Sequence, residues 1–362
     1  MRQIALLTLS VIAVILLSPS PLTAKTQFDH RESENKKPRV VILATGGTIA
    51  GSASSSTQAS YKPGVLSIEQ ILKTVPEIET LAQLKGIQIS NIASQDMEEG
   101  IWLELWRTID NLFTHDLCDG VVITHGTDTM EESAYFLNLT IRHAKPVVIT
   151  GAMRASTSLS PDGPFNLFNA VALAASANAQ NRGVMVVMND YILSADDVTK
   201  TNTINTNAFE CPNFGPLGYM RNGTPHFFRE SRYTHTASSI FNIKGLTALP
   251  KTEIVYAYAF SSDIAINALI DGSTEGIVIA GVGHGNYNKA IAEAMKKGSS
   301  KGVNFVRSSR IIGGGVDLSA ENYDPRWPVS FNKTPQKARI LLMLALTITK
   351  EPKEIQNIFM EY

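Results

Sequence analysis

Apolar residues follow two different spacings along most of the chain. Short runs rich in β-branched residues, such as Val40 to Ala44, have the length and composition of strands buried on both faces of a parallel sheet. Other segments place apolar residues three or four positions apart, which is typical of amphipathic helices. The alternation of these segments predicts an α/β fold, in which helices cover both faces of a parallel-rich sheet.

The expected elements form two series separated by a polar stretch. In the first series we expect strands at 40–44, 87–92, 120–124, 146–150 and 183–188, and helices from residue 67, over 100–113 and 131–141, and through 168–175. The Asn- and Thr-rich stretch 191–233 favours hairpins or extended excursions. In the second series we expect strands at 254–258, 276–280 and 303–307, and helices at 262–270, 289–295, 338–349 and 352–360.

The length of the chain, 362 residues, exceeds the size at which a single core stops growing. We therefore expect a larger N-terminal catalytic α/β domain over 39–230, a linker over 231–252, and a smaller C-terminal α/β domain over 253–362. Within the linker, Ile240, Phe241 and Ile243 should pack against something.

Residues 1–24 have the plan of a secretory signal peptide. Arg2 precedes an almost unbroken apolar block from Ile4 to Leu17, and a small residue lies at the expected cleavage site. The block is shorter than the roughly 20 residues of a membrane span, although an uncleaved anchor remains the alternative. With 25–38 as a flexible leader, we expect a soluble mature protein that is periplasmic or secreted.

Composition excludes some partners. The chain has 32 basic and 33 acidic residues, and they are interspersed, so no charged surface for nucleic acid or membranes is expected. Only two cysteines are present, Cys118 and Cys211. A bridge between them is open but has no support in the sequence.

Two of the expected strands end in the same way, in glycine followed by threonine. The first leads into Gly46-Gly47-Thr48 and the second into Gly126-Thr127-Asp128. Each is read most simply as a tight turn. However, parallel strands bring their carboxyl ends to one edge of a sheet, where such folds bind ligands. The sequence therefore predicts a site with two hydroxyl groups at this edge.

Nucleotide sites fit the glycines poorly. The Gly47 turn lacks the Lys-Ser/Thr of a phosphate-binding loop and the third glycine of a dinucleotide fingerprint. Gly281-Val-Gly283-His-Gly285 has the wrong spacing as well. These glycine spacings leave no nucleotide cofactor expected. The seven histidines do not fall at i and i+4 on any expected helix, so no metal is expected. His125 fits a structural hydrogen-bonding role better than that of a ligand.

A threonine nucleophile needs help, because its hydroxyl is weak at neutral pH. Asp128 and Lys200 are candidates, since a lysine among such groups can accept a proton. Taken singly, the lysine also fits the surface and the aspartate a helix cap. Tyr61 lies in the small-residue stretch 52–64, which is either a linker or a lid. Backbone N–H groups at the Gly47 and Gly126 turns are candidates for an oxyanion hole.

Several motifs carry a resemblance. Ala-Thr-Gly-Gly-Thr-Ile-Ala-Gly from Ala44 and Ile-Thr-His-Gly-Thr-Asp-Thr-Met-Glu-Glu from Ile123 resemble the bacterial type II (exported) L-asparaginases of the asparaginase/glutaminase family. So do Gly151-Ala-Met-Arg, Asp197-Val-Thr-Lys-Thr-Asn and Gly215-Pro-Leu-Gly. The resemblance implies hydrolysis of L-asparagine to L-aspartate and ammonia through an acyl-enzyme intermediate, with secondary L-glutamine hydrolysis left open. It also implies a homotetramer with active sites shared between subunits.

The resemblance assigns catalytic roles to five residues. Thr48 matches the family's nucleophile and Tyr61 the lid tyrosine that hydrogen-bonds it. Thr127, Asp128 and Lys200 match the proton-relay triad.

It assigns substrate binding to a further set. Ser94, Gln95 and Asp128 match residues that bind the α-carboxylate and α-amino groups, and Ala152 matches a backbone carbonyl near the amide. Glu321 matches less closely an acid that a neighbouring subunit contributes. Gly47 is expected at the same site.

Some positions depart from the family, and other functions remain. Phe260 replaces an asparagine of the best-known members, with Ser261 as a substitute, and His115 and His143 occupy the places of a disulfide found in some members.

The runner-up function is an exported amino-acid-binding protein without turnover. A related amidotransferase subunit acting on charged transfer RNA is a further alternative, against which the signal peptide argues.

Overall fold

The structure is a computed structural model, and it describes residues 36–51, 64, 66–319 and 324–362. Residues Lys37–Tyr362 form one compact unit, to which the following description applies. The predictions about the signal peptide, about Tyr61 and about Glu321 concern residues outside the described ranges. No helix among the described residues is both long and apolar enough to cross a bilayer.

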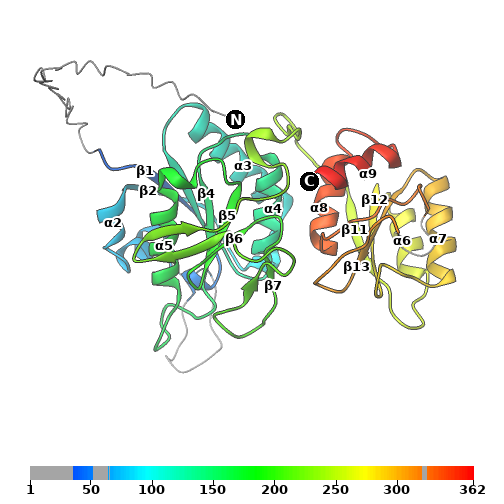
Figure 1. Ribbon diagram of the computed structural model, residues 1–362, viewed down its shortest axis with the longest axis horizontal. Coiled ribbons are helices and arrows are strands. Elements are labelled where there is room, and N and C mark those ends of the chain that lie inside the picture. The colour runs from blue at the N-terminus through cyan, green and yellow to red at the C-terminus, as the bar shows by residue number, and fades with distance from the viewer. Residues whose placement is uncertain (1–35, 52–63, 65, 320–323) are drawn as a thin grey trace, which may run out of the picture. The chain divides into compact units, whose positions relative to one another are not determined.

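The larger part of the unit is built on an eight-stranded sheet (Figure 1). Its order is β10-β9-β6-β5-β4-β3-β1-β2, and the strands β2, β1, β3, β4 and β5 are parallel neighbours, while β6, β9 and β10 continue the sheet antiparallel. The strands are β1 (Arg39–Gly46), β2 (Gln83–Ile92), β3 (Gly120–Thr124), β4 (Val147–Thr150), β5 (Val184–Met188), β6 (Tyr191–Ser194), β9 (Gly218–Arg221) and β10 (Thr224–Phe227).

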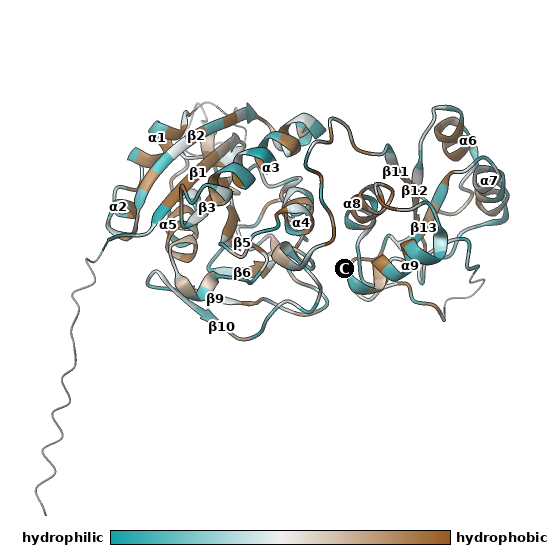
Figure 2. Ribbon diagram, turned by 90° about the horizontal axis from the view of Figure 1, so that it is seen from above, coloured by the Kyte–Doolittle hydropathy of each residue, from teal (hydrophilic) through white to brown (hydrophobic). Residues whose placement is uncertain are grey.

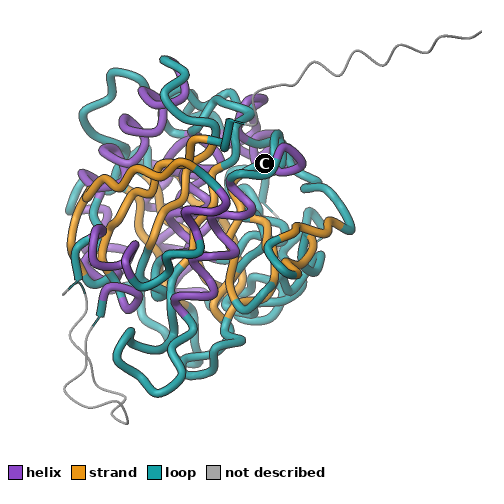
Figure 3. Tube along the Cα trace, turned by 90° about the vertical axis from the view of Figure 1, so that its left-hand side faces the viewer, coloured by secondary structure: helices purple, strands orange, loops and turns teal. Residues whose placement is uncertain are grey.

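Both faces of this sheet are buried by helices, as the strand sequences predict. Alternate residues of β1 enter two different apolar clusters: Val41 and Leu43 on one face, and Val40 and Ile42 on the other. One cluster contains the helices α3 (Glu99–Thr114) and α4 (Met130–Thr140), and the other contains α1 (Ile68–Lys73), α2 (Ile78–Leu81) and α5 (Gly163–Ala174). Figure 3 shows the strands between helices.

A smaller parallel sheet follows, in the order β11-β12-β13. Its elements are β11 (Thr252–Tyr256), β12 (Gly276–Gly281), β13 (Asn304–Ser309), α6 (Ile264–Asp271), α7 (Lys289–Ser300), α8 (Pro335–Ala345) and α9 (Pro352–Glu361). Helix α8 packs on one face, and α6 and α7 share the apolar cluster on the other (Figure 1). Helix α8 also contacts α4, and its hydrophobic residues are brown in Figure 2. The α/β fold class is confirmed.

Two local expectations are corrected by the structure. Strand β2 begins at Gln83 rather than after Gly86, because Gly86 lies inside the strand where a Cβ would meet Ile68 Cγ1 at 2.6 Å. In the expected linker, Phe241 and Ile243 are buried, whereas the Ile240 side chain is 49% exposed. Ile240 is fixed through its backbone instead, since its N–H donates to the Tyr362 hydroxyl.

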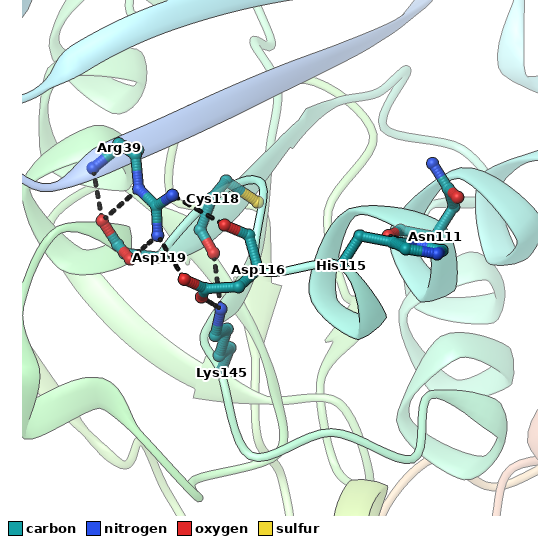
Figure 4. A network of polar contacts seen from close by, with 7 residues as sticks. All are labelled: Arg39, Asn111, His115, Asp116, Cys118, Asp119 and Lys145. Atoms are coloured by element: carbon teal, nitrogen blue, oxygen red, sulfur yellow. Dashed lines mark hydrogen bonds and ion pairs between the residues drawn. The ribbon is translucent and has the colours of Figure 1, made fainter.

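A charged network joins the start of β1 to the loop before β3 (Figure 4). The Arg39 guanidinium donates to both carboxylate oxygens of Asp119 and to the Asp116 carbonyl. Lys145 Nζ donates to Asp116 Oδ1 at 2.5 Å and to the Cys118 carbonyl at 2.8 Å. Cys118 and Cys211 are free and buried, and burial raises the pKa of the Cys118 thiol to about 11.

Candidate active site

The turn after β1 brings Thr48 to the carboxyl edge of the large sheet. Gly47 has a φ of 77° and lies so close to the next turn that a Cβ would be 2.4 Å from Gly126 Cα. Only glycine fits there, because the contact is with backbone. Thr48 starts a short 3-10 helix, Thr48–Ala50, and is 4% exposed.

The turn after β3 carries the second threonine. A Cβ on Gly126 would lie 2.7 Å from Ser94 Cβ, so the turn also packs against the short 3-10 helix Ser94–Asp96 that follows β2. Ser94 binds this turn twice: its hydroxyl accepts from the Asp128 N–H at 3.1 Å, and its carbonyl accepts from Thr129 Oγ1 at 2.7 Å. Three strand ends are thereby joined at one point.

Lys200 reaches this point from a separate two-stranded ribbon. It lies on β7 (Thr199–Lys200), which pairs with β8 (Phe209–Glu210). Its Nζ donates to Thr127 Oγ1 at 2.8 Å and to Asp128 Oδ1 at 2.6 Å. The Lys200 side chain is 16% exposed and that of Asp128 is 60% exposed. The ion pair is therefore buried on the lysine side and open to solvent on the acid side.

A cavity of about 760 Å³ lies in front of these groups. Thr48, Thr127, Asp128 and Lys200 all line it. The rest of the lining comes from two loops, 153–158 before α5, of which the sequence singled out only Met153 and Arg154, and 203–207 between β7 and β8, which it did not single out. The signal for the second loop was available, since Thr203, Asn205, Thr206 and Asn207 are polar residues that follow the Lys200 motif, with Ile204 among them.

The other expected binding residues are placed less directly. Ser94 is buried behind the second turn, Ala152 is buried against Gly163, and Gln95 is exposed beside Ser94. The expectation of an oxyanion donor is wrong for the Gly47 N–H itself, because that group donates to the Ile92 carbonyl at 2.9 Å. Gly64, the last residue of the stretch 52–64, donates its N–H to the Gly47 carbonyl at 3.2 Å.

His125 has the structural role that the sequence favours. Its Nδ1 hydrogen-bonds to the Gly126 carbonyl at 2.7 Å and its Nε2 to Ser133 Oγ at 2.9 Å. Burial lowers the pKa of His125 to about 4, so the ring is neutral at pH 7. Among the described residues, no group of three or more histidine, cysteine, aspartate or glutamate side chains is placed to hold a metal ion.

Comparison with known proteins agrees with these features. Residues 39–233 match the family model "Asparaginase, N-terminal", and residues 251–359 match the "Glutaminase/Asparaginase C-terminal domain". L-asparaginase 2 of Escherichia coli is 49% identical over 90% of this chain and 93% of its own. Glutaminase-asparaginase of Pseudomonas fluorescens is 43% identical over 97% of each chain.

A solved structure shows the same fold. The crystal structure of a probable cytoplasmic L-asparaginase from Campylobacter jejuni superposes with a TM-score of 0.88 at 47% identity, covering 90% of this chain and 100% of that one. Both family models match, and together they span most of the chain. The chain therefore belongs to the asparaginase/glutaminase family.

Proposed function

We propose that this protein hydrolyses L-asparagine to L-aspartate and ammonia, with Thr48 as the nucleophile. The observation that carries the proposal is the contact of Lys200 Nζ with both Thr127 and Asp128, on the wall of a cavity that Thr48 also lines. The substrate class is supported by the relatives, which are named L-asparaginase or glutaminase-asparaginase.

The reaction needs two transfers at one carbon. The Thr48 oxygen attacks the carbonyl carbon of the side-chain amide, the C–N bond breaks, and the nitrogen takes up a proton and leaves as ammonia. An ester between Thr48 and the aspartyl group remains. Water then attacks this ester, the C–O bond to Thr48 breaks, and the threonine hydroxyl is restored. One amide and one water give one carboxylic acid and one ammonia.

Thr127, the second threonine, is suited to transferring a proton during the reaction. The Thr127 hydroxyl accepts a hydrogen bond from Lys200, so its own hydrogen can be donated into the cavity. Asp128 pairs with the lysine and is exposed enough to meet the α-amino group of the substrate. In this proposal Ser94, Gln95 and Asp128 bind the α-groups, and Ala152 accepts from the amide.

L-glutamine is proposed as a secondary substrate. It differs from L-asparagine by one methylene, and a pocket discriminates such a difference by only about 1 to 3 kcal/mol. Two relatives named glutaminase-asparaginase match 97% of this chain at 42% and 43% identity.

The remaining parts of the proposal concern assembly and location. Tyr61 assists Thr48, and Glu321 of a neighbouring subunit completes the site in a homotetramer. We retain the domain limits 39–230 and 253–362, and export to the periplasm or medium after cleavage of residues 1–24. A relative from Haemophilus influenzae, 47% identical, is named as periplasmic, which supports this location.

Ammonia release by the purified mature protein tests the proposal. We expect turnover of L-asparagine by the wild type and a loss of at least about a thousandfold in Thr48→Ala, because no other group replaces the nucleophile. Thr80→Ala, at an exposed threonine whose hydroxyl donates to the Glu77 carbonyl, is the control and should keep full activity. An inactive wild type, or an active Thr48→Ala, contradicts the proposal, and L-aspartate binding without turnover would indicate a binding protein.

A further inference from the structure

The backbone of Lys200 is bound by a buried carboxylate outside the cavity wall. Glu131, in the first turn of α4, is 4% exposed, and its Oε2 accepts from the Lys200 N–H at 2.6 Å. Its other oxygen accepts from Gln336 Nε2 on α8, also at 2.6 Å. Both oxygens of a buried acid are thus used in orienting two other segments.

Helix α8 binds the same ribbon a second time. The next residue, Lys337, is 1% exposed and its Nζ donates to the Val198 carbonyl. On the other side the ribbon continues its pairing, with the Thr201 N–H donating to the Ala208 carbonyl at 2.7 Å. The backbone from Val198 to Thr201 is therefore held from both sides.

A single turn contacts Lys200 at both ends of its side chain. Thr127 and Asp128 bind the ammonium group, and Glu131, three residues after Asp128, binds the backbone N–H. A lysine side chain is long and flexible, so the position of its nitrogen depends on where its backbone is fixed. Burying a carboxylate is costly unless it is hydrogen-bonded, and here it accepts two short hydrogen bonds at a helix N-terminus, which favours negative charge.

We infer that Glu131, oriented by Gln336, is a positioning residue that places Lys200 against Thr127 and Asp128. This inference rests on the proposed function, because it assigns Lys200 a part in the reaction. Its consequence is that α8, which packs on the small sheet, helps to set the geometry of a site on the large sheet. Glu131 acts through the lysine and makes no contact with the reacting atoms.

Substitutions at position 131 separate the hydrogen bond from the charge. Glu131→Met removes the acceptor for the Lys200 N–H, and we expect kcat to fall about 10- to 100-fold with KM within about threefold, as for a small displacement of a catalytic group. Glu131→Gln keeps an acceptor, and the Gln336 amide can rotate to match it, so kcat should stay within about threefold of the wild type. Gln336→Met should also lower kcat, by a smaller factor than Glu131→Met. This variant replaces Glu131→Met in the test if Glu131→Met does not fold.

Glu132→Met is the matched control. Glu132 also lies in the first turn of α4 and also contacts α8, through Arg339 Nη2 at 3.2 Å, but its partner does not lead to Lys200. The kcat of the Glu132→Met variant should equal that of the wild type. The inference is overturned if kcat falls equally in Glu131→Met and Glu132→Met. It is also overturned if kcat falls in neither Glu131→Met nor Gln336→Met.

Hydrogen exchange of the peptide containing 198–201 provides a readout that does not need activity. Exchange should accelerate in Glu131→Met and not in Glu132→Met. If the wild type releases no ammonia, the proposed function fails, while faster exchange still supports the contact of Glu131 with the ribbon. Unchanged exchange in Glu131→Met overturns the inference whatever the activity of the wild type.

Discussion

Gly47 and Gly126 set the distance between the two threonine turns. A Cβ on Gly47 would lie 2.4 Å from both the N and the Cα of Gly126, closer than real Cβ atoms approach other atoms. Backbone cannot rotate away from such a clash as a side chain can. Thr48 and Thr127 therefore line one cavity only because both turns lack side chains at the contact.

Gly47→Ala should damage stability and activity together. Its φ of 77° disfavours alanine and the clash adds overpacking, so we expect a loss of more than about 1 kcal/mol in the free energy of unfolding and of most ammonia release. Gly245→Ala is the control, because Gly245 has a φ of 87° but no atom within 4 Å of its added Cβ. Denaturant unfolding of both variants compares the clash with the backbone cost alone, and equal losses would show that the contact is unimportant.

Among the elements, β1 is fixed at its start as well as at the end that leads to Thr48. Arg39 connects the first residue of the strand to Asp119, directly before β3, while Gly47 and Thr48 follow the other end. The Arg39 guanidinium, through its hydrogen bonds, holds the pKa of Asp119 below its usual range. The network thus contributes to the register of two parallel neighbours in the centre of the sheet.

Arg39→Met should cost stability in a pH-dependent way. The depressed pKa of Asp119 means that the contribution is present above the unfolded pKa of about 4 and is lost as the pH falls through the lower folded pKa. Because both side chains are more than a third exposed, we expect only about 1 kcal/mol or less at pH 7.

The difference between Arg39→Met and wild type should shrink below pH 4 and in high salt. Arg107→Met, which removes an exposed 3.7 Å pair with Glu104 on α3, should change stability less at every pH. Chemical unfolding at pH 7 and pH 3 measures both effects, and a difference that is as large at pH 3 as at pH 7 would assign the loss to something other than the ion pair.

The sequence predicted those elements whose pattern of hydrophobic residues is unambiguous. Val40 to Ala44 and Val121 to Ile123 are buried on both faces, so their apolar runs sufficed to place the turns that carry Thr48 and Thr127. Gly86 misled the prediction of β2, because a glycine suggests the end of a strand. Here the glycine lies inside the strand, where it leaves room for the side chain of Ile68 on α1. Glu131 was missed because its partners, Lys200 and Gln336, are distant in sequence and a glutamate at a helix start is unremarkable by itself.

At the scale of the whole molecule, the assembly remains a proposal with an exposed surface in its favour. Near the carboxyl end of β11, Tyr256, Tyr258 and Phe260 are more than half exposed, and Phe260 has a φ of 63°. Exposed large hydrophobic side chains that lie close together in the sequence are candidates for contacts with another subunit. Ser261, by contrast, is buried and donates to the Tyr258 carbonyl in its own turn.

Dilution should therefore reduce activity. If neighbouring subunits share the site, specific activity should fall as the oligomer dissociates, and should return when the sample is concentrated again. Sedimentation velocity at the same concentrations relates the loss to the subunit count. A monomer with full specific activity would contradict the shared site, whereas an irreversible loss would point to denaturation.

The packing of Gly47 on Gly126 also has a consequence for engineering. Because a side chain at Gly47 would meet the backbone of Gly126, we expect most substitutions at these two glycines to give inactive proteins. The cavity is completed by two loops, 153–158 and 203–207, in which Arg154, Ile204 and Asn205 are exposed or partly exposed. We expect selection for a longer or shorter amide to find its tolerated changes in these loops, so that the proposed nucleophile Thr48 and the selectivity of the site can change separately.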